Sequence, residues 1–321
     1  MKLLGLLFSF VTIGSVALAA FAQEYPTKPI RLIVAYTPGG GSDLLGRVVA
    51  KKLGEALGQQ VIVENRPGAG GNIGTEAMAK AAPDGYTLGI VPSTHAIAPN
   101  LYARLAFDPI KDFTFITLVA SGPNILVCHP SVPATSVKEL IALAKRRPGE
   151  LTFASAGVGS STHLAGEYFK SVANINVVHV PYKGSSQAQI DLAGGQVSYM
   201  VDSMPSALPR VQAGRIRALA TTGKARFPAL PSVPTVLESG LPYESISWWG
   251  IVGPAGIPQT IVNKLLAEIT RFMSLPDARQ IVATQGAEVT TGTPQQFLDY
   301  VKQETALYGN IIRTANIHTE Q

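Results

Sequence analysis

Short apolar runs alternate with amphipathic helical stretches along most of the chain. Residues 30–36 are almost all apolar, as in a strand buried on both faces. A helical pattern follows, with apolar residues on one face from Leu44 to Leu57, and Gly58 is placed to end it. Two further strands are expected at 61–63 and 86–91, with a helix at 75–81 between them.

The alternation restarts after residue 124. Strands are expected at 125–128, 151–154, 177–180, 197–201, 216–220 and 248–252. Capping boxes at Ser136–Glu139 and Thr293–Gln296 mark two helix starts, and a long helical stretch covers 258–273. This order predicts an α/β fold of two lobes, each a mainly parallel sheet flanked by helices. The helical chain end is expected to pack back on the first lobe.

The first residues have the pattern of an export signal. Lys2 precedes an apolar run over 3–18, and Ala20-Phe21-Ala22 fits a small-x-small cleavage site. We therefore expect a cleaved signal peptide at 1–22, with Gln23 as the first mature residue. The run is short for a membrane span, which needs about 20 residues, so an uncleaved anchor is the weaker interpretation.

Composition fits an exported protein with two packed cores. The chain has 321 residues, of which 46% are hydrophobic and 15% charged. Cys128 is the single cysteine, so no intrachain disulfide can form, which points to a bacterial periplasm. The net charge of +5 comes from scattered basic residues, a pattern that argues against nucleic-acid binding.

Three glycine-rich connections could carry chemistry, at 37–43, 65–74 and 155–163. Glycine lets the backbone approach a ligand closely, and a following helix presents unpaired amides with a partial positive charge. With the hydroxyls of serine and threonine, such loops form a carboxylate site that needs no basic side chain. The alternative is that they are only tight turns, with Asp43 and Ser161 as helix caps.

Competing motifs are absent from the sequence. Both glycine patterns that approach a dinucleotide fingerprint lack the third glycine, and neither a phosphate loop nor a G-x-S-x-G elbow occurs. The five histidines show no metal-ligand spacing, so we expect no metal and no cofactor. His95 and His163 lie beside Ser/Thr/Gly-rich segments and are candidates for ligand contact, although a structural role is the commoner one.

Three further positions leave alternatives open. Lys183, after Tyr182, could face a cleft or only solvent, and Asp202 could contact a ligand or cap the segment that starts at Ser203. Trp248-Trp249 fits core or hinge packing better than a stacking platform.

Several long motifs resemble those of the Bug family, the periplasmic receptors of tripartite tricarboxylate transporters. They are 25–34, 38–43, 63–74, 82–88, 180–184 and 249–256, and the resemblance extends over essentially the whole mature chain. The resemblance implies a two-lobed Venus-flytrap fold of the periplasmic-binding-protein type. It implies lobe one at 23–124 and 249–321 and lobe two at 125–248.

The resemblance also implies that loops Pro38–Asp43 and Ser155–His163 hold a ligand carboxylate, partly through ordered water. Tyr36, where the family commonly has phenylalanine, and Ser93, Thr94 and Asp202 fall where cleft-lining residues would be expected. The candidate ligand-binding residues are Tyr36, Pro38, Gly39, Gly40, Gly41, Ser42, Asp43, Ser93, Thr94, His95, Ser155, Ala156, Gly157, Gly159, Ser160, Ser161, His163, Tyr182, Lys183 and Asp202.

The sequence thus predicts a monomeric, non-enzymatic periplasmic receptor. It would close on a small carboxylate and deliver it to the membrane permease subunits of a tripartite tricarboxylate-type importer. One alternative is a ligand sensor that docks on a membrane signalling receptor. A less favoured one is an exported hydrolase, for which Ser160 and His163 are the only tempting pair.

Overall fold

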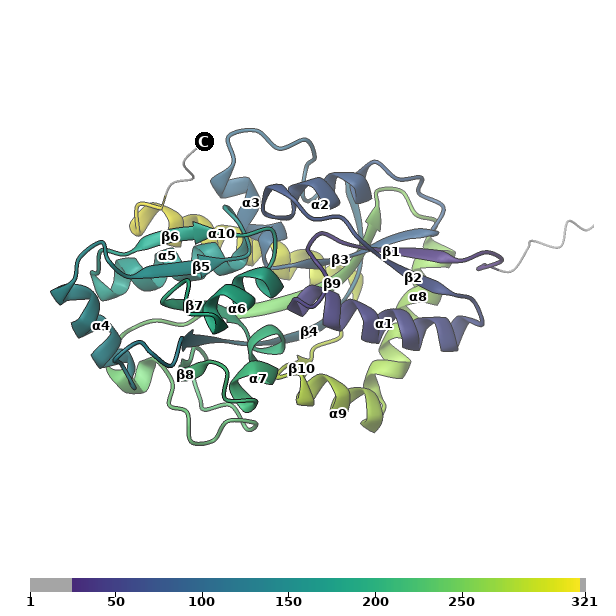
Figure 1. Cartoon of the computed structure of the whole chain (residues 1–321). Helices are drawn as coiled ribbons and strands as arrows, with labels where there is room; N and C mark the ends of the chain where they lie inside the picture. The colour runs from purple at the N-terminus through teal and green to yellow at the C-terminus, as the bar shows by residue number, and fades with distance from the viewer. Residues whose placement is uncertain (1–24, 318–321) are drawn as a thin grey trace, which may run out of the picture.

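The computed structural model describes residues 25–317, so the predicted signal peptide at 1–22 lies outside the described residues (Figure 1). The strands are β1 (Ile30–Val34), β2 (Val61–Asn65), β3 (Thr87–Pro92), β4 (Phe113–Cys128), β5 (Thr152–Ser155), β6 (Val178–Pro181), β7 (Tyr199–Ser203), β8 (Arg217–Thr221), β9 (Ile246–Pro254) and β10 (Glu288–Val289). The helices are α1 (Gly41–Leu57), α2 (Asn72–Ala79), α3 (Thr94–Leu101), α4 (Val137–Arg146), α5 (Ser161–Ala173), α6 (Ser185–Ala193), α7 (Met204–Gln212), α8 (Gln259–Ser274), α9 (Pro276–Thr284) and α10 (Pro294–Thr314). A search of the described helices found none with the length and apolar character of a membrane span.

Lobe one, as we use the name, is built on a sheet with the strand order β2-β1-β3-β9-β4. The first three strands are parallel, whereas β9 runs antiparallel to both β3 and β4. On one face, Leu45 of α1 and Leu265 of α8 pack on the sheet, and on the other Met78 of α2 and Phe297 of α10 do so. Both faces are therefore covered, which explains why 30–36 reads as a continuous apolar run.

Lobe two is built on a second sheet, in which β5 pairs in parallel with β6 and β7. The far half of β4 runs antiparallel to β7 and β8 in the same sheet. Leu140 of α4 and Phe169 of α5 cover one face, and Leu192 of α6 and Leu208 of α7 cover the other. The parallel pairs expected from the alternation are present, and the antiparallel strands β4 and β9 add to them.

Two strands connect the lobes. The 16-residue strand β4 pairs with β9 up to Pro123 and with β7 from Asn124 onward. The sequence pattern indicated only its last four residues, 125–128, because Gly122-Pro123 interrupts the apolar run before them. The exchange of partners falls close to the predicted lobe boundary at 124/125, which remains a prediction.

The terminal helix α10 extends past lobe one. Phe297 and Val301 lie in the core of lobe one, whereas Ile312 and Ile317 pack with Leu164 of α5, in lobe two. In Figure 1 this yellow helix runs from beneath the first sheet to the side of α5. The chain end packs on the first lobe as expected, and α10 is long enough to reach α5 of lobe two as well.

Of the two predicted capping boxes, that of α10 is complete and that of α4 is formed only in part. Thr293 and Gln296 form the complete capping box of α10, with Pro294 in the first turn. At α4 the Ser136 hydroxyl accepts the amide of Glu139 as expected. The Glu139 carboxylate, however, accepts from the amide and hydroxyl of Thr135, one residue before the predicted partner.

Candidate ligand site between the lobes

A small cavity, which we call the inner cavity, lies where the two lobes meet. Its volume is about 30 Å³, enough for one or two water molecules or a carboxylate group. Its lining residues come from both lobes and are Tyr36, Gly40, Gly41, Ser42, Pro92, Ala156, Ser161, Thr162, Ser185, Ser203, Ser247 and Trp249. None of these described residues carries a formal charge.

The starts of four helices converge on the inner cavity. Gly41 and Ser161 are the first residues of α1 and α5, Ser185 is the first of α6, and Ser203 is the N-cap of α7. The first amides of a helix have no partner within the helix, and they carry a partial positive charge. One helix from lobe one and three from lobe two thus make a positive environment without a basic side chain, which suits an anion.

Asp43 fixes the shape of the loop before α1, and its side chain does not line the inner cavity. The buried Asp43 carboxylate accepts from the Gly39 amide at 2.9 Å, from Asn65 Nδ2 at 2.9 Å and from Arg47 through two nitrogens. Burial by itself would raise the pKa of this carboxyl, but the hydrogen bonds from Arg47, Gly39 and Asn65 together lower it. Asp43 therefore stays charged and fixes the turn that presents Gly40 and Gly41.

The loop before α5 is fixed by its own side chains. Thr162 Oγ1 accepts the amide of Ala156 at 2.8 Å, and His163 Nδ1 accepts that of Gly159 at 3.2 Å. Ser160 Oγ accepts the amide of His163 and acts as the helix N-cap. These residues shape the loop, and its contribution to the inner cavity comes from Ala156, Ser161 and Thr162.

A stacked pair of histidines, the buried His163 and the half-buried His179, adjoins this loop. The rings of His163 and His179 stack with their centroids 4.2 Å apart, and His179 Nε2 lies 2.6 Å from Ser155 Oγ. The Ser155 hydroxyl in turn accepts the amide of Gly157 at 3.1 Å. Desolvation lowers the pKa of His163 to about 4 and, with His163 and Lys170 nearby, that of His179 to about 3.

Asp202 supports the inner cavity from behind. Its side chain is fully buried and accepts from Ser185 Oγ, Gln189 Nε2 and the Ser203 amide, each at 2.8 Å. Burial raises the pKa of this carboxyl, although the hydrogen bonds act in the opposite direction. Asp202 thus anchors the two serines that line the cavity, and ligand contact at Asp202 remains a prediction.

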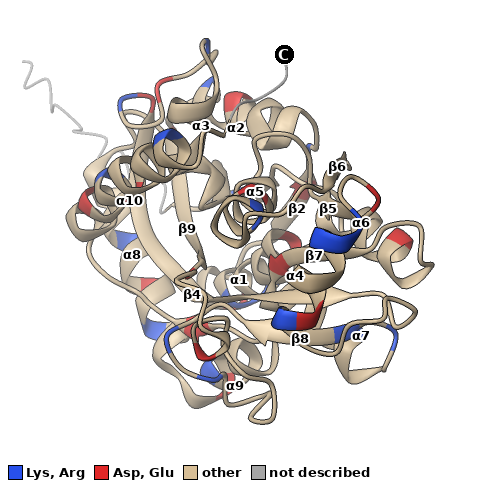
Figure 2. Cartoon of the chain, turned by 90° about the vertical axis from the view of Figure 1, so that its left-hand side faces the viewer, with Lys and Arg blue, Asp and Glu red and all other residues tan. Residues whose placement is uncertain are grey.

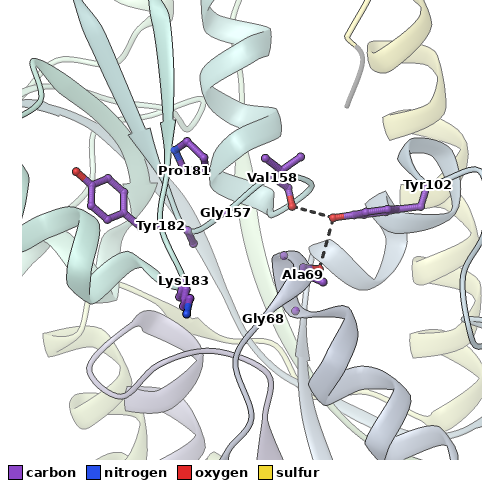
Figure 3. Close-up of a pocket in the computed structure, with 11 residues that line it drawn as sticks. Gly68, Ala69, Tyr102, Gly157, Val158, Pro181, Tyr182 and Lys183 are labelled. Atoms are coloured by element: carbon purple, nitrogen blue, oxygen red, sulfur yellow. Dashed lines mark hydrogen bonds between the residues drawn. The ribbon is translucent and has the colours of Figure 1, made fainter. Parts of the chain in front are cut away.

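A larger cavity of about 310 Å³, the outer cavity, adjoins the inner one at Ala156 (Figure 3). It is lined by Gly68, Ala69, Gly70, Gly71, Tyr102, Ala156, Gly157, Val158, Pro181, Tyr182 and Lys183. Lys183 is exposed at this cavity, whereas the Tyr182 hydroxyl turns away to donate to Asp191 at 2.8 Å. The outer cavity therefore offers one cationic side chain and many backbone groups to the body of a ligand.

Direct contacts hold the lobes together around these cavities. The Ser161 amide donates to Thr94 Oγ1 at 3.1 Å, and the Tyr102 hydroxyl donates to the carbonyl of Val158 at 2.8 Å, as Figure 3 shows. Within lobe one, the Tyr36 hydroxyl donates to the carbonyl of Gly70 and lies within hydrogen-bond distance of Thr94 Oγ1, both at 2.7 Å. The loops before α1 and α5 thus face each other across the inner cavity.

The structure brings about half of the predicted residues to a cavity. Those that line one are Tyr36, Gly40, Gly41, Ser42, Ala156, Gly157, Ser161, Tyr182 and Lys183. Those that line neither are Pro38, Gly39, Asp43, Ser93, Thr94, His95, Ser155, Gly159, Ser160, His163 and Asp202. Most of the second group hydrogen-bond to lining residues or shape the loops that carry them.

His95 has no such connection. Its ring is packed among Phe107, Phe113 and Phe115, and its Nε2 lies 2.7 Å from the carbonyl oxygen of Pro109. Desolvation lowers its pKa to about 4. The expectation of ligand contact at His95 is therefore not supported, because the helix α3 directs this side chain into the core and away from both cavities.

Six residues of the inner cavity were not among the candidates: Pro92, Thr162, Ser185, Ser203, Ser247 and Trp249. Ser185 begins α6 shortly after β6, and Ser203 is both the last residue of β7 and the N-cap of α7, so both positions carry the strand-to-helix signal that identified the other loops. Ser247 and Trp249 come from the returning strand β9, and nothing in their local sequence indicates a cavity. The outer cavity adds Gly68 to Gly71, a loop noted for its glycines but not selected.

The buried histidines predict an acid-labile fold. His95 is 3% exposed and stays neutral in the folded chain down to about pH 4, whereas in the unfolded chain it binds a proton below about pH 6.5. Its contribution to stability is complete above pH 6.5 and falls by up to about 3 kcal/mol as the pH drops towards 4. Urea unfolding at pH 7 and 4.5 should show a smaller loss for His95→Phe than for the unchanged chain. Equal losses in the two proteins would contradict the role of His95.

Comparisons with known proteins agree with this geometry. Residues 45–317 match the family described as the tripartite tricarboxylate transporter family receptor. The protein BugT from Bordetella pertussis is 35% identical over 315 residues, covering 97% of each chain. The solved structure of R. palustris Rpa4515 with adipate has a TM-score of 0.90 at 37% identity and covers 92% of this chain and 99% of its own. That of MatC from Rhodopseudomonas palustris with bound malate has a TM-score of 0.86 at 30% identity, covering 90% and 100%.

The fold and the cavity between its lobes define a two-lobed solute-binding protein of the periplasmic type, which confirms the predicted fold class. More narrowly, the chain belongs to the Bug family, the receptors of tripartite tricarboxylate transporters, as its sequence motifs predicted.

Proposed function

We propose that this chain captures a small carboxylate in the inner cavity and delivers it to a tripartite tricarboxylate-type importer. The observation that carries the proposal is the convergence of four helix starts, from both lobes, on a cavity lined by uncharged groups. Hydrogen bonds to an ionised group contribute roughly 1.5–3 kcal/mol each. Three or four, after the costs of ordering and desolvation, are compatible with about −8 kcal/mol, a micromolar dissociation constant.

The two cavities would hold different parts of the ligand. The inner cavity has room for the carboxylate and little else, so the rest of the molecule would extend past Ala156 into the outer cavity. There the exposed Lys183 and the backbone of Gly68 to Gly71 would contact it. The solved relatives with adipate and malate support an organic acid of this size.

Capture would proceed by hinge closure. We place lobe one at 23–124 and 249–321 and lobe two at 125–248, so that β4 and β9 cross the boundary. A carboxylate bound to α1 on one side and to α5 and α6 on the other would favour the closed form over the open one. The contact of Tyr102 with Val158 and that of Thr94 with Ser161 would then form on closure.

The remaining features follow from the family. We place the mature chain in the periplasm as a monomer, after removal of residues 1–22, with membrane permease subunits as its partners. A sensor that docks on a signalling receptor has the same cleft and is the alternative. Loss of uptake of the identified acid in a deletion strain favours transport, and intact uptake with a lost transcriptional response favours sensing.

We propose a binding role rather than an enzymatic one. The Ser160 hydroxyl accepts the amide of His163, and the Nδ1 atom of that histidine accepts the amide of Gly159. A hydrolase would need the hydroxyl hydrogen-bonded to the imidazole as its base. The observed arrangement favours support of the loop over activation of a nucleophile.

The test is a thermal-shift and calorimetric titration of the mature protein. The panel contains adipate, malate, other organic acids, amino acids, nicotinate and aromatic acids, each beside the amide in which its carboxylate is replaced by a neutral group. A ligand that binds only the folded state at about 1,000 times its Kd stabilises by ~4 kcal/mol, so at least one acid should raise Tm by about 5 °C or more. The amides should give no shift. A panel in which no acid shifts Tm, or in which the amides act equally, would count against anion capture.

A further inference from the structure

A second large cavity lies beside the hinge, and we call it the hinge groove. Its volume is about 540 Å³, within the range of small-molecule sites. It is lined by Ile97, Asn124, Ser161, Leu164, Ala165, Tyr168, Glu244, Ser245, Ile246, Tyr300, Glu304, Leu307, Tyr308, Asn310, Ile311 and Thr314. The elements that carry these residues can be followed in Figure 2, with α10 on one side, α5 on the other, α3 above and β9 between them. The groove shares only Ser161 with the inner cavity.

The hinge groove carries negatively charged side chains, whereas the inner cavity is lined by uncharged residues at the positive ends of helices. Two carboxylates, Glu244 and Glu304, line it together with three phenol rings, and its described lining contains no lysine, arginine or histidine. The rings belong to Tyr168 on α5 and to Tyr300 and Tyr308 on α10. Aromatic faces with carboxylates nearby attract ammonium groups through the ring quadrupole and through charge.

The two carboxylates lack a cation of their own. Within residues 25–317, neither Glu244 nor Glu304 forms an ion pair. Glu304 is half-buried, and its Oε2 accepts from Trp248 Nε1 at 3.1 Å. Burial raises its pKa, as expected for a carboxyl without a positive neighbour. Glu244 is exposed at the other wall, next to the start of β9.

From this geometry we propose that the hinge groove binds a small organic ammonium ion with an apolar body. The ammonium would lie between Glu304 and Glu244, and its body would contact the tyrosine rings and the apolar side chains Ile97, Leu164 and Leu307. Charge complementarity favours a cation over an anion or a neutral molecule here. The proposal does not depend on carboxylate capture, because the carboxylates and tyrosines that would bind the ammonium line the groove and neither of the two ligand cavities.

The test uses benzylamine as the probe, with benzyl alcohol as the neutral molecule of the same shape, in calorimetric or NMR titrations of the full mature protein at pH 7.5. We expect benzylamine to bind at least 10-fold more tightly than benzyl alcohol, and more weakly as salt rises. Glu244→Gln, at an exposed position, should weaken benzylamine binding threefold or more. Glu304→Gln should weaken it further, and Tyr300→Ala should weaken both probes.

Asp299→Asn is the matched control, because it removes one negative charge from the exposed face of α10 outside the groove. It should leave benzylamine binding within about twofold of the unchanged protein. Equal binding of the two probes would overturn the proposal, as would equal affinities in Glu244→Gln, Glu304→Gln and Asp299→Asn. Circular dichroism and Tm identify any variant that fails to fold, and the exposed Glu244 position keeps the test decisive in that case.

Discussion

Replacing Gly41 with valine should weaken carboxylate binding by at least 100-fold while the protein stays folded. A Cβ atom at Gly41 would lie 2.6 Å from Ser203 Oγ and 3.1 Å from Trp249 Cζ2. The serine hydroxyl could rotate away from alanine, but the two methyl groups of valine would also fill the inner cavity. Overpacking of this kind costs about 1–3 kcal/mol, and the anion would lose its place between α1 and α7 as well. Calorimetric titration with the acid identified by the panel gives the affinity.

The control for this experiment is Gly194→Val. Gly194 is exposed at the end of α6, and a Cβ atom there would meet only the carbonyls of Ile190 and Asp191, at 3.4 and 3.6 Å. It should bind the acid as the unchanged protein does. An unchanged affinity in Gly41→Val, with Tm within a few degrees of the unchanged protein, would show that the ligand does not occupy the inner cavity.

Asp202→Ala should destabilise the fold by about 3–5 kcal/mol and weaken ligand binding too. The substitution leaves three donors without their acceptor, those of Ser185, Gln189 and Ser203. Each unpaired buried polar group costs about 1–3 kcal/mol. Ser185 and Ser203 line the inner cavity, so their loss of anchorage should also reduce affinity. Urea unfolding measures the first effect and titration with the ligand the second.

Asp202→Asn separates the loss of hydrogen bonds from the loss of charge. The buried Oε1 atom of Gln189 has no hydrogen-bond partner among residues 25–317, so a flipped Gln189 amide could accept from the new Asn side chain. This variant should therefore keep most of the stability that Asp202→Ala loses. Should the two variants lose equal stability, or should both lose less than about 1 kcal/mol, the anchoring role of Asp202 would be refuted.

The pattern of the sequence was sufficient for the architecture. A strand that is buried on both faces is apolar at nearly every position, whereas a helix that packs on the sheet is apolar along one face only. Burial therefore determines the residue type position by position, and both kinds of element can be recognised from the local sequence. Thr293 and Gln296 show the same locality, since a capping box joins residues three positions apart. The full length of β4 was not predicted, because its pairing with β9 joins segments more than 100 residues apart.

The residues of the site likewise fall into two groups, those that the local sequence indicated and those that only the tertiary structure placed. From the sequence alone came two glycine-rich loops that precede helices, and with them Gly40, Gly41 and Ser161, since a helix start is a local feature. Only the tertiary structure decided which neighbours face the cavity and which stand behind it. Asp43, His163 and Asp202 proved to support the loops, while Ser203 and Trp249 line the cavity. The physical reason is that the direction of a polar side chain depends on which partners the packing of distant segments brings within hydrogen-bond reach.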